Sequence, residues 1–279
     1  RDWREMAGSL GNSGIWSGFT ACAGVAAWVC LSGSGSRAGK ALAGLCATAT
    51  MAGLVAGDSR AAWLGFAVGS MGWWWGMLRG RWRRVASVAV AVGIAGIMVF
   101  VGMRPERAAS AEGRLLVWKV AGRVFAEHPW GTGTDGFRRT YGEAQGRYLE
   151  EEGTARERAL ADETTVAFNE GVRTAVETGM PGLALLATFV WLALRREKGE
   201  GMEAETRGRG MRSALGAWMA FALFSYPATV FQCWMVFVVL LAGRASGAKE
   251  VMAFRTGRVT AVGMTVAVMV AVAAHFPYR

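Results

Sequence analysis

The chain has 279 residues, of which 53% are hydrophobic and only 19% are charged, with a formal net charge of +10. Soluble domains carry about 25% charged residues. Here the charges are clumped and leave apolar stretches long enough to cross about 30 Å of hydrocarbon. This composition excludes a soluble enzyme, a disordered tail and a disulfide scaffold. The basic residues separate apolar stretches instead of lining one face, which indicates membrane orientation and not nucleic-acid binding.

The sequence predicts an all-α, polytopic membrane bundle. Its apolar segments lie at about 14–32, 41–57, 60–78, 85–103, 167–194, 208–243 and 258–275. The segment 208–243 is too long for one ordinary span, and Pro227 near its middle lacks a backbone donor and disfavours helix in the residue before it. We therefore predict two helices there, turning at 225–227, and about eight spans in all.

Basic residues predict the orientation of these spans. With the turn at 225–227, one side of the membrane receives sixteen basic residues and the short connections on the other side receive four. The positive-inside rule then places the polar stretch 104–166 outside the cytoplasm. We predict a first group of spans in 1–103 and an extracytoplasmic loop in 104–166. The spans that complete the core follow in 167–243, and a cytoplasmic loop with a terminal span in 244–279.

The loop 104–166 contains one clear periodic pattern. Leu116, Val120 and Val124 repeat at helical spacing beside a polar stripe of Lys119, Arg123 and Glu127. This pattern predicts an amphipathic helix that lies along the membrane surface or over the bundle. The polar stretch 143–159 is weakly patterned, and we expect a mobile lid or a loose loop there.

Glycine and cysteine patterns have structural interpretations. The G-x-G-x-x-G at Gly131, Gly133 and Gly136 lacks the strand before it that a dinucleotide site needs, so it predicts a tight turn. GxxxG spacings at Gly65/Gly69 and Gly72/Gly76 predict close helix packing. The four cysteines lie in apolar runs without a CxxC pair, which favours buried thiols over a metal or redox site.

Two arginines and one polar stretch are candidate functional groups. Arg60 follows a predicted span at the outer mouth, and Arg114 is expected to start the amphipathic helix, where a cation is disfavoured by the helix dipole. Either they are interfacial residues, or they converge on an anion such as a diphosphate, which guanidiniums bind through paired hydrogen bonds. The stretch 162–170, with Glu163, Asn169 and Glu170, enters a span, where its polar groups have a capping role or a functional one.

Several segments, in this order, resemble conserved motifs of the bacterial O-antigen ligases and the related protein O-oligosaccharyltransferases and O-antigen polymerases. They are Gly8-Ser9-Leu10-Gly11-Asn12-Ser13, Asp58-Ser59-Arg60-Ala61-Ala62-Trp63, Arg114-Leu115-Leu116-Val117-Trp118, Glu127-His128-Pro129-Trp130-Gly131-Thr132-Gly133 with Phe137, and Asn169 followed by Glu177-Thr178-Gly179-Met180-Pro181-Gly182-Leu183. The resemblance covers nearly all of residues 8–243.

The resemblance implies an all-helical, GT-C-type glycosyltransferase of the inner membrane, without a metal, nucleotide-sugar or other cofactor. The donor would be a glycan on undecaprenyl diphosphate. The acceptor would be a lipid A–core sugar or a protein Ser/Thr hydroxyl, and the site would face the periplasm. Arg60 and Arg114 would hold the diphosphate while the loop 104–166 covers the donor and admits the acceptor.

One departure affects the expected base. The histidine that usually precedes Asn169 in this family is Phe168 here. If 162–170 is helical, Glu163 and Glu170 share a face and Phe168 points elsewhere. We therefore expect Glu163 or Glu170 to act as the base and Asn169 to orient a substrate. The rival interpretation is that diphosphate departure needs no base.

Two other functions compete with the ligase. A polymerase of the same superfamily would extend the glycan instead of attaching it. A transporter or flippase for lipid-linked sugars belongs to another class and ranks third, because the predicted spans carry almost no charge and show no internal repeat.

Overall fold

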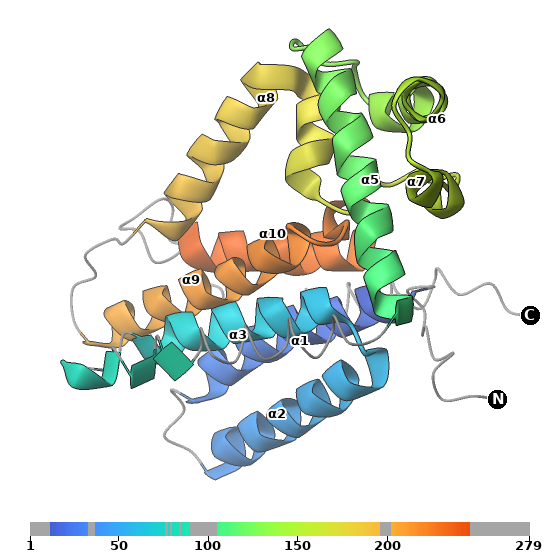
Figure 1. Cartoon of the computed structure of the whole chain (residues 1–279). Coiled ribbons are helices and arrows are strands. Elements are labelled where there is room, and N and C mark those ends of the chain that lie inside the picture. The colour runs from blue at the N-terminus through green and yellow to red at the C-terminus, as the bar shows by residue number, and fades with distance from the viewer. Residues whose placement is uncertain are drawn as a thin grey trace, which may run out of the picture.

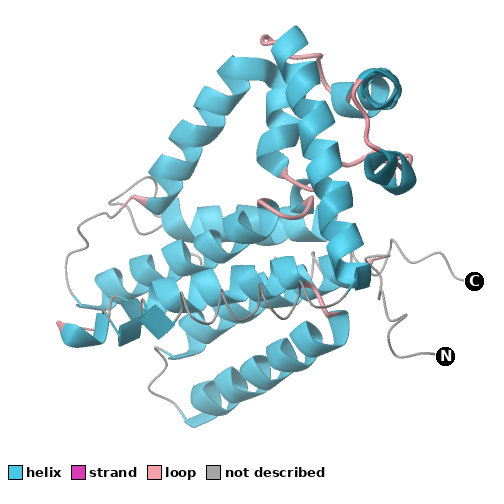
Figure 2. Cartoon of the chain, in the orientation of Figure 1, coloured by secondary structure: helices cyan, strands magenta, loops and turns pink. Residues whose placement is uncertain are grey.

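The computed structural model describes residues 12–32, 37–75, 105–195 and 202–245, together with a few positions between 78 and 89. Every regular element within these ranges is a helix, and no strand occurs among them (Figure 2). The all-α prediction is therefore confirmed for the described residues. Of the predicted spans, most of 85–103 and all of 258–275 lie outside them.

Five helices lie side by side in a bundle (Figure 1). They are α1 (Ser13–Ser32), α2 (Arg37–Gly57), α3 (Arg60–Trp75), α9 (Met202–Ala222) and α10 (Phe231–Ala245). Their bounds agree closely with the apolar segments predicted from the sequence. Two helices of the described chain, Arg37–Gly57 and Glu170–Leu194, are long and apolar enough to cross a membrane, and Phe231–Gly243 is a shorter apolar helix.

Glycines let α3 approach α9 closely. A Cβ on Gly65 would lie 2.8 Å from the carbonyl oxygen of Ala217, and one on Gly69 would lie 3.0 Å from that of Ser213. Since real Cβ atoms rarely come so near, the absence of a side chain at these positions sets the distance between the two helices. The packing role predicted for the first GxxxG spacing is confirmed.

The long apolar segment 208–243 is broken where Pro227 predicted. The helix α9 ends at Ala222, a 3₁₀ turn follows at Pro227–Thr229, and α10 begins at Phe231. The two helices then pack through aromatic rings, with the Trp218 and Phe237 centroids 4.3 Å apart. The indole of Trp218 also donates a hydrogen bond to the carbonyl of Cys233 at 3.0 Å.

The polar stretch folds as a helical cap at one end of the bundle. It consists of α5 (Pro105–Glu127), α6 (Gly136–Glu151) and α7 (Ala155–Leu160). Leu116, Val120 and Val124 are buried against α6 and the first turns of α8, so the amphipathic pattern is confirmed. The prediction of a lid or loose loop at 143–159 is wrong. Most of that stretch is helical, and a capping box between Thr154 and Glu157 starts α7.

The predicted segment 167–194 is not one straight helix. In α8 (Glu170–Leu194) the backbone of Gly179 is non-helical, with φ 65° and ψ −157°, and the helix changes direction there (Figure 1). Pro181 has no N–H to donate to the carbonyl of Glu177. Gly133 in the glycine turn donates to that carbonyl instead, at 2.9 Å. The turn before α6 therefore completes the hydrogen bonding of the broken helix, and the turn prediction for this motif is confirmed.

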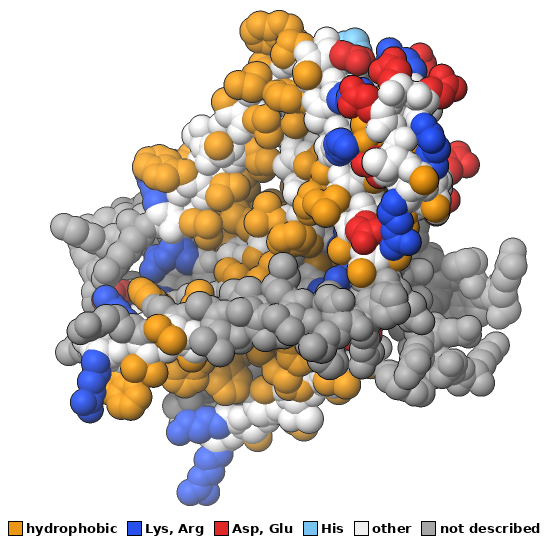
Figure 3. Space-filling view, in the orientation of Figure 1, with side chains coloured by type: hydrophobic (Ala, Val, Ile, Leu, Met, Phe, Trp, Pro, Cys, Tyr) orange, Lys and Arg blue, Asp and Glu red, His pale blue; other side chains and the backbone are white. Residues whose placement is uncertain are grey.

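Charged and apolar side chains occupy different parts of the molecule. In the view of Figure 3 the charged side chains gather over α6 and α7, whereas most side chains visible over α8 are hydrophobic. Leu185 and Trp191 on α8 are 72% and 63% exposed. Such exposure is unfavourable in water, and it fits helices that contact lipid.

Candidate functional site

Arg60 and Arg114 line one cavity of about 340 Å³ where the cap meets the bundle. We call this cavity the arginine pocket. Its lining also contains one acidic residue, Asp58, and small or polar residues, which are Asn12, Ser13, Gly14, Gly57, Ser59, Ala61 and Ser110. The convergence of the two arginines, which the sequence spacing alone could not establish, is thus present in the structure.

Two helices begin at the arginine pocket. Asn12 caps α1, because its Oδ1 accepts hydrogen bonds from the backbone N–H groups of Gly14 at 2.8 Å and Ile15 at 3.2 Å. Arg60 is the first residue of α3, and the hydroxyl oxygen of Ser59 accepts from the N–H of Ala62 at 3.4 Å. Helix N-termini carry partial positive charge. Both helices therefore add to the positive potential of the two guanidiniums.

Arg114 is held from two sides. Its Nη1 donates to the carbonyl of Phe224 at 3.0 Å, and its guanidinium carbon lies 5.1 Å from the centroid of the Phe168 ring. Burial, and secondly the positive charge of Arg60, lower the pKa of this guanidinium below its usual value. The prediction that Arg114 starts a helix is wrong, because α5 begins at Pro105 and the helix-dipole argument therefore does not apply.

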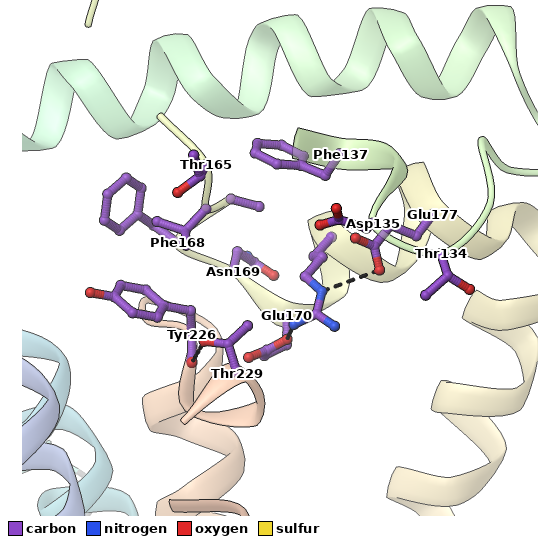
Figure 4. Close-up of a pocket in the computed structure, with 13 residues that line it drawn as sticks. Thr134, Asp135, Phe137, Thr165, Phe168, Asn169, Glu170, Glu177, Tyr226 and Thr229 are labelled. Atoms are coloured by element: carbon purple, nitrogen blue, oxygen red, sulfur yellow. Dashed lines mark hydrogen bonds and ion pairs between the residues drawn. The ribbon is translucent and has the colours of Figure 1, made fainter. Parts of the chain in front are cut away.

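A second cavity, of about 250 Å³, lies between the cap and the turn at Pro227 (Figure 4). We call it the glutamate pocket. Its polar lining includes Glu170, Glu177, Asp135 and Tyr226. Arg173 lies between two of the carboxylates, 3.5 Å from Glu170 and 3.3 Å from Glu177.

Glu170 is the most constrained carboxylate in the glutamate pocket. Its Oε1 accepts a hydrogen bond from the backbone N–H of Ala228 at 2.8 Å, which joins the start of α8 to the turn between α9 and α10. The Glu170 side chain is only 14% exposed, and Arg173 lies beside it. A largely buried carboxylate that lines a cavity is a candidate general base.

Glu163 and Glu170 do not share a helical face. Residues 161–169 are not helical, and α8 begins only at Glu170, so that prediction is wrong. Glu163 is exposed and lines a different cavity. Asn169 is the N-cap of α8, and its Oδ1 accepts from the N–H groups of Gly171 at 2.8 Å and Val172 at 3.1 Å. Because an N-cap residue has a non-helical backbone, the helix of Glu170 does not extend back to Glu163.

Phe168 connects the two pockets. Its backbone has a φ of 51°, a left-handed conformation that is uncommon for an aromatic residue. Its ring lies over Arg114 of the arginine pocket and makes an edge contact with Tyr226 at 5.8 Å between centroids. Both Phe168 and Tyr226 line the glutamate pocket. The Tyr226 hydroxyl accepts a hydrogen bond from Asn12 Nδ2 at 3.3 Å.

Tyr226 is a site residue that the sequence analysis missed. The turn at Pro227 was predictable, but no local signal shows that the preceding tyrosine returns to the start of α1. Burial raises the pKa of its phenol, and the charge of Arg114 opposes this rise.

No cluster of three or more His, Cys, Asp or Glu side chains able to hold a metal ion occurs in the described ranges. Cys22 and Cys233 are buried free thiols and Cys46 is partly buried, in agreement with the interpretation of the cysteines as packing residues.

The described chain thus combines apolar helices, a polar helical cap and a pocket with two arginines where the cap meets the bundle. A family model described as O-antigen ligase matches residues 42–187, more than half of the 279 residues. The chain belongs to this family, which makes it a membrane protein and a glycosyltransferase-like enzyme of the ligase or polymerase kind. The match contains Arg60, Arg114, Asn169 and Glu170. No curated protein matches the chain.

Proposed function

We propose that this protein transfers a glycan from undecaprenyl diphosphate to an acceptor hydroxyl, on a lipid A–core sugar or a protein Ser/Thr, at the periplasmic face of the inner membrane. The proposal includes an eight-span, GT-C-type bundle. The observation that carries it is the arginine pocket, in which Arg60 and Arg114 lie beside the N-termini of α1 and α3.

The arginine pocket suits a diphosphate leaving group. Each guanidinium can donate two parallel hydrogen bonds to phosphate oxygens, and helix N-termini add further N–H donors and a favourable dipole. When the bond between the sugar C1 and the diphosphate oxygen breaks, negative charge grows on that oxygen. Fixed positive groups are most effective where charge develops in the transition state. We assign Arg60 and Arg114 to this role.

The glutamate pocket supplies the base in this proposal. The acceptor hydroxyl loses its proton to Glu170, its oxygen forms the new bond to C1, and the bond from C1 to the diphosphate breaks. Asn169 positions Glu170, because the Asn169 side chain caps α8 and Glu170 is the first residue of that helix. Phe168, in contact with Arg114 and Tyr226, keeps the proton-accepting and diphosphate-binding sides adjacent. The exposed Glu163 is the less suitable base.

The test is a transfer assay with the purified full chain and a purified undecaprenyl-diphosphate glycan. One reaction offers lipid A–core as the acceptor, and a second offers a Ser/Thr-containing protein. We expect a new glycosidic product with one acceptor and release of undecaprenyl diphosphate. A product in which glycan units are joined to each other would make the protein a polymerase. Movement of the donor across vesicles without any glycosidic product would overturn the proposal in favour of a flippase.

A further inference from the structure

A third cavity lies on the cap, beside the glutamate pocket. It has a volume of about 790 Å³ and lies between α6 and the non-helical segment 161–165. We call it the cap groove. Its charged lining residues are Arg138, Arg139, Asp162 and Glu163, and its other polar lining residues include Gln145 and Thr165.

The cap groove adjoins the proposed reaction site. Thr165 lines both the cap groove and the glutamate pocket, so this residue lies between the two cavities. The segment that separates them is short and leads directly to Phe168 and Asn169. If the sugar that reacts lies in the glutamate pocket, the chain of sugars attached to it can extend past Thr165 into the cap groove.

The lining of the cap groove has both hydrogen-bond donors and acceptors. The two guanidiniums and the two carboxylates give the lining a formal net charge of zero. Such a lining does not favour binding of a polyanion such as a nucleic acid. Arg138 is paired with Asp135 at 2.8 Å, and Arg139 donates through Nη2 to the carbonyl of Thr134 at 3.0 Å. A guanidinium carries five N–H donors, so these contacts fix the groups and leave donors for a ligand.

The cap groove has little apolar lining. The ring of Tyr141 is buried, at 1% exposure, and its hydroxyl accepts from Gln145 at 3.1 Å. Peptide grooves usually offer apolar pockets or a strand edge, and no large exposed apolar side chain lines this cavity. A dense array of planar polar groups instead matches the hydroxyl-rich edges of sugars.

We propose that the cap groove binds the segment of an oligosaccharide next to the sugar that reacts, a proposal that rests on the function proposed above. Two sources share this chemistry. The segment belongs either to the glycan of the donor or to a glycan acceptor.

Binding is measured first, by titration of the purified full chain with oligosaccharides of two to eight sugars, released by mild acid from the source organism's own surface polysaccharide. Arg138→Ala and Gln145→Ala should each weaken binding about tenfold, the loss expected for one or two hydrogen bonds. Arg147→Ala is the matched control. Arg147 is also an exposed arginine on α6 in an ion pair, with Glu127 at 3.3 Å, but it lines none of the three cavities.

Thermal unfolding of all three variants checks that the cap remains folded. Absence of oligosaccharide binding by the unaltered protein, or equal binding by all the variants, would overturn the proposal. So would binding of a Ser/Thr-containing peptide that is lost in the same two variants.

Transfer assays then separate the two sources. If the segment belongs to the donor, Arg138→Ala and Gln145→Ala should raise KM about tenfold for a donor with a full glycan and leave KM unchanged for a donor with one sugar. If it belongs to the acceptor, KM should rise for the longer acceptor only. Identical KM values for long and short substrates in both variants would contradict the cap groove even if the protein transfers glycan. Failure of all transfer would contradict the proposed function and leave the binding titration to decide on the groove.

Discussion

The guanidinium carbon of Arg114 lies 5.1 Å from the centroid of the Phe168 ring. Phe168 stands at the position where the family resemblance leads us to expect a histidine. Its ring makes a cation–π contact with the Arg114 guanidinium. An imidazole at this position would itself be able to carry charge beside Arg114. A phenylalanine gives a contact that does not change with pH, and it cannot accept a proton.

Phe168→Ala should reduce transfer about tenfold, because a partly desolvated cation–π contact contributes on the order of 1–2 kcal/mol. Phe168→Tyr keeps the ring and should recover most of this activity. Initial rates at saturating acceptor give the comparison. Equal rates for the alanine variant and the unaltered protein would show that the ring does not position Arg114.

Arg60→Ala and Arg114→Ala should each lower transfer at least a hundredfold, because either change removes a charge-assisted contact that we propose to the leaving diphosphate. Arg60→Lys should restore little, since an ammonium cannot form the paired hydrogen bonds. The measurement is kcat for purified variants of matched expression. Arg156→Ala is a suitable control, because Arg156 is an exposed cap arginine paired with Glu112 at 2.7 Å and lines none of the three cavities. Full activity of Arg114→Ala would remove that residue from the mechanism.

Gly179→Ala should destabilise the junction between the glycine turn and α8. Backbone strain at a φ of 65° contributes about 1–3 kcal/mol, and the new Cβ would lie 2.3 Å from the carbonyl oxygen of Pro129. Gly122→Ala on α5 is the control, because a Cβ there meets nothing within 4 Å and alanine favours helix. Unfolding temperatures should fall for the first variant and hold or rise for the second. The same temperature for both would mean that the junction tolerates a side chain.

The sequence predicted features that depend on local periodicity. The bundle helices, the break at Pro227 and the buried face of α5 all follow from spacing and from the backbone chemistry of proline. The helices of 136–160 were missed because their stability comes from distant contacts. Tyr141 and Tyr148 are 1% exposed, and Tyr148 donates to Glu157 at 2.8 Å.

The candidate site was predictable only in part. Arg60 and Arg114 were identified by type and position, but their common pocket depends on how α5 meets the bundle. Glu170 was identified together with Glu163, and tertiary contacts separate them. Glu170 accepts a hydrogen bond from the N–H of Ala228, whereas Glu163 is exposed. Tyr226 enters the site through the folding of distant segments, which no spacing rule describes.

Glu157→Gln should make the unfolding temperature of the protein less dependent on pH. The backbone N–H of Thr154, the Tyr148 hydroxyl and the Lys119 ammonium lower the pKa of Glu157 from 4.5 to about 2. A carboxylate whose pKa is lower in the folded state stabilises the fold above its unfolded pKa and loses this contribution as pH falls toward the folded value. The unfolding temperature of the unaltered protein should therefore exceed that of the variant at pH 7, and the difference should narrow between pH 5 and pH 3. A difference that stays constant over this range would contradict the contribution of the charged form.

Glu170→Gln tests whether a base takes part in the reaction. A positioned base contributes about 10²–10⁴-fold, and glutamine keeps the shape and can still accept from the N–H of Ala228 while it cannot take up a proton. We expect the rate of the unaltered protein to fall with decreasing pH, because a protonated Glu170 can no longer accept the proton of the acceptor hydroxyl. The variant should be at least a hundredfold slower and should lack this acidic limb. Glu163→Gln should keep the acidic limb, and Glu150→Gln, an exposed α6 carboxylate that lines none of the three cavities, controls for the loss of one negative charge. If Glu170→Gln keeps a near-normal rate with the acidic limb intact, no carboxylate base acts at this position, and departure of the diphosphate toward Arg60 and Arg114 carries the reaction alone.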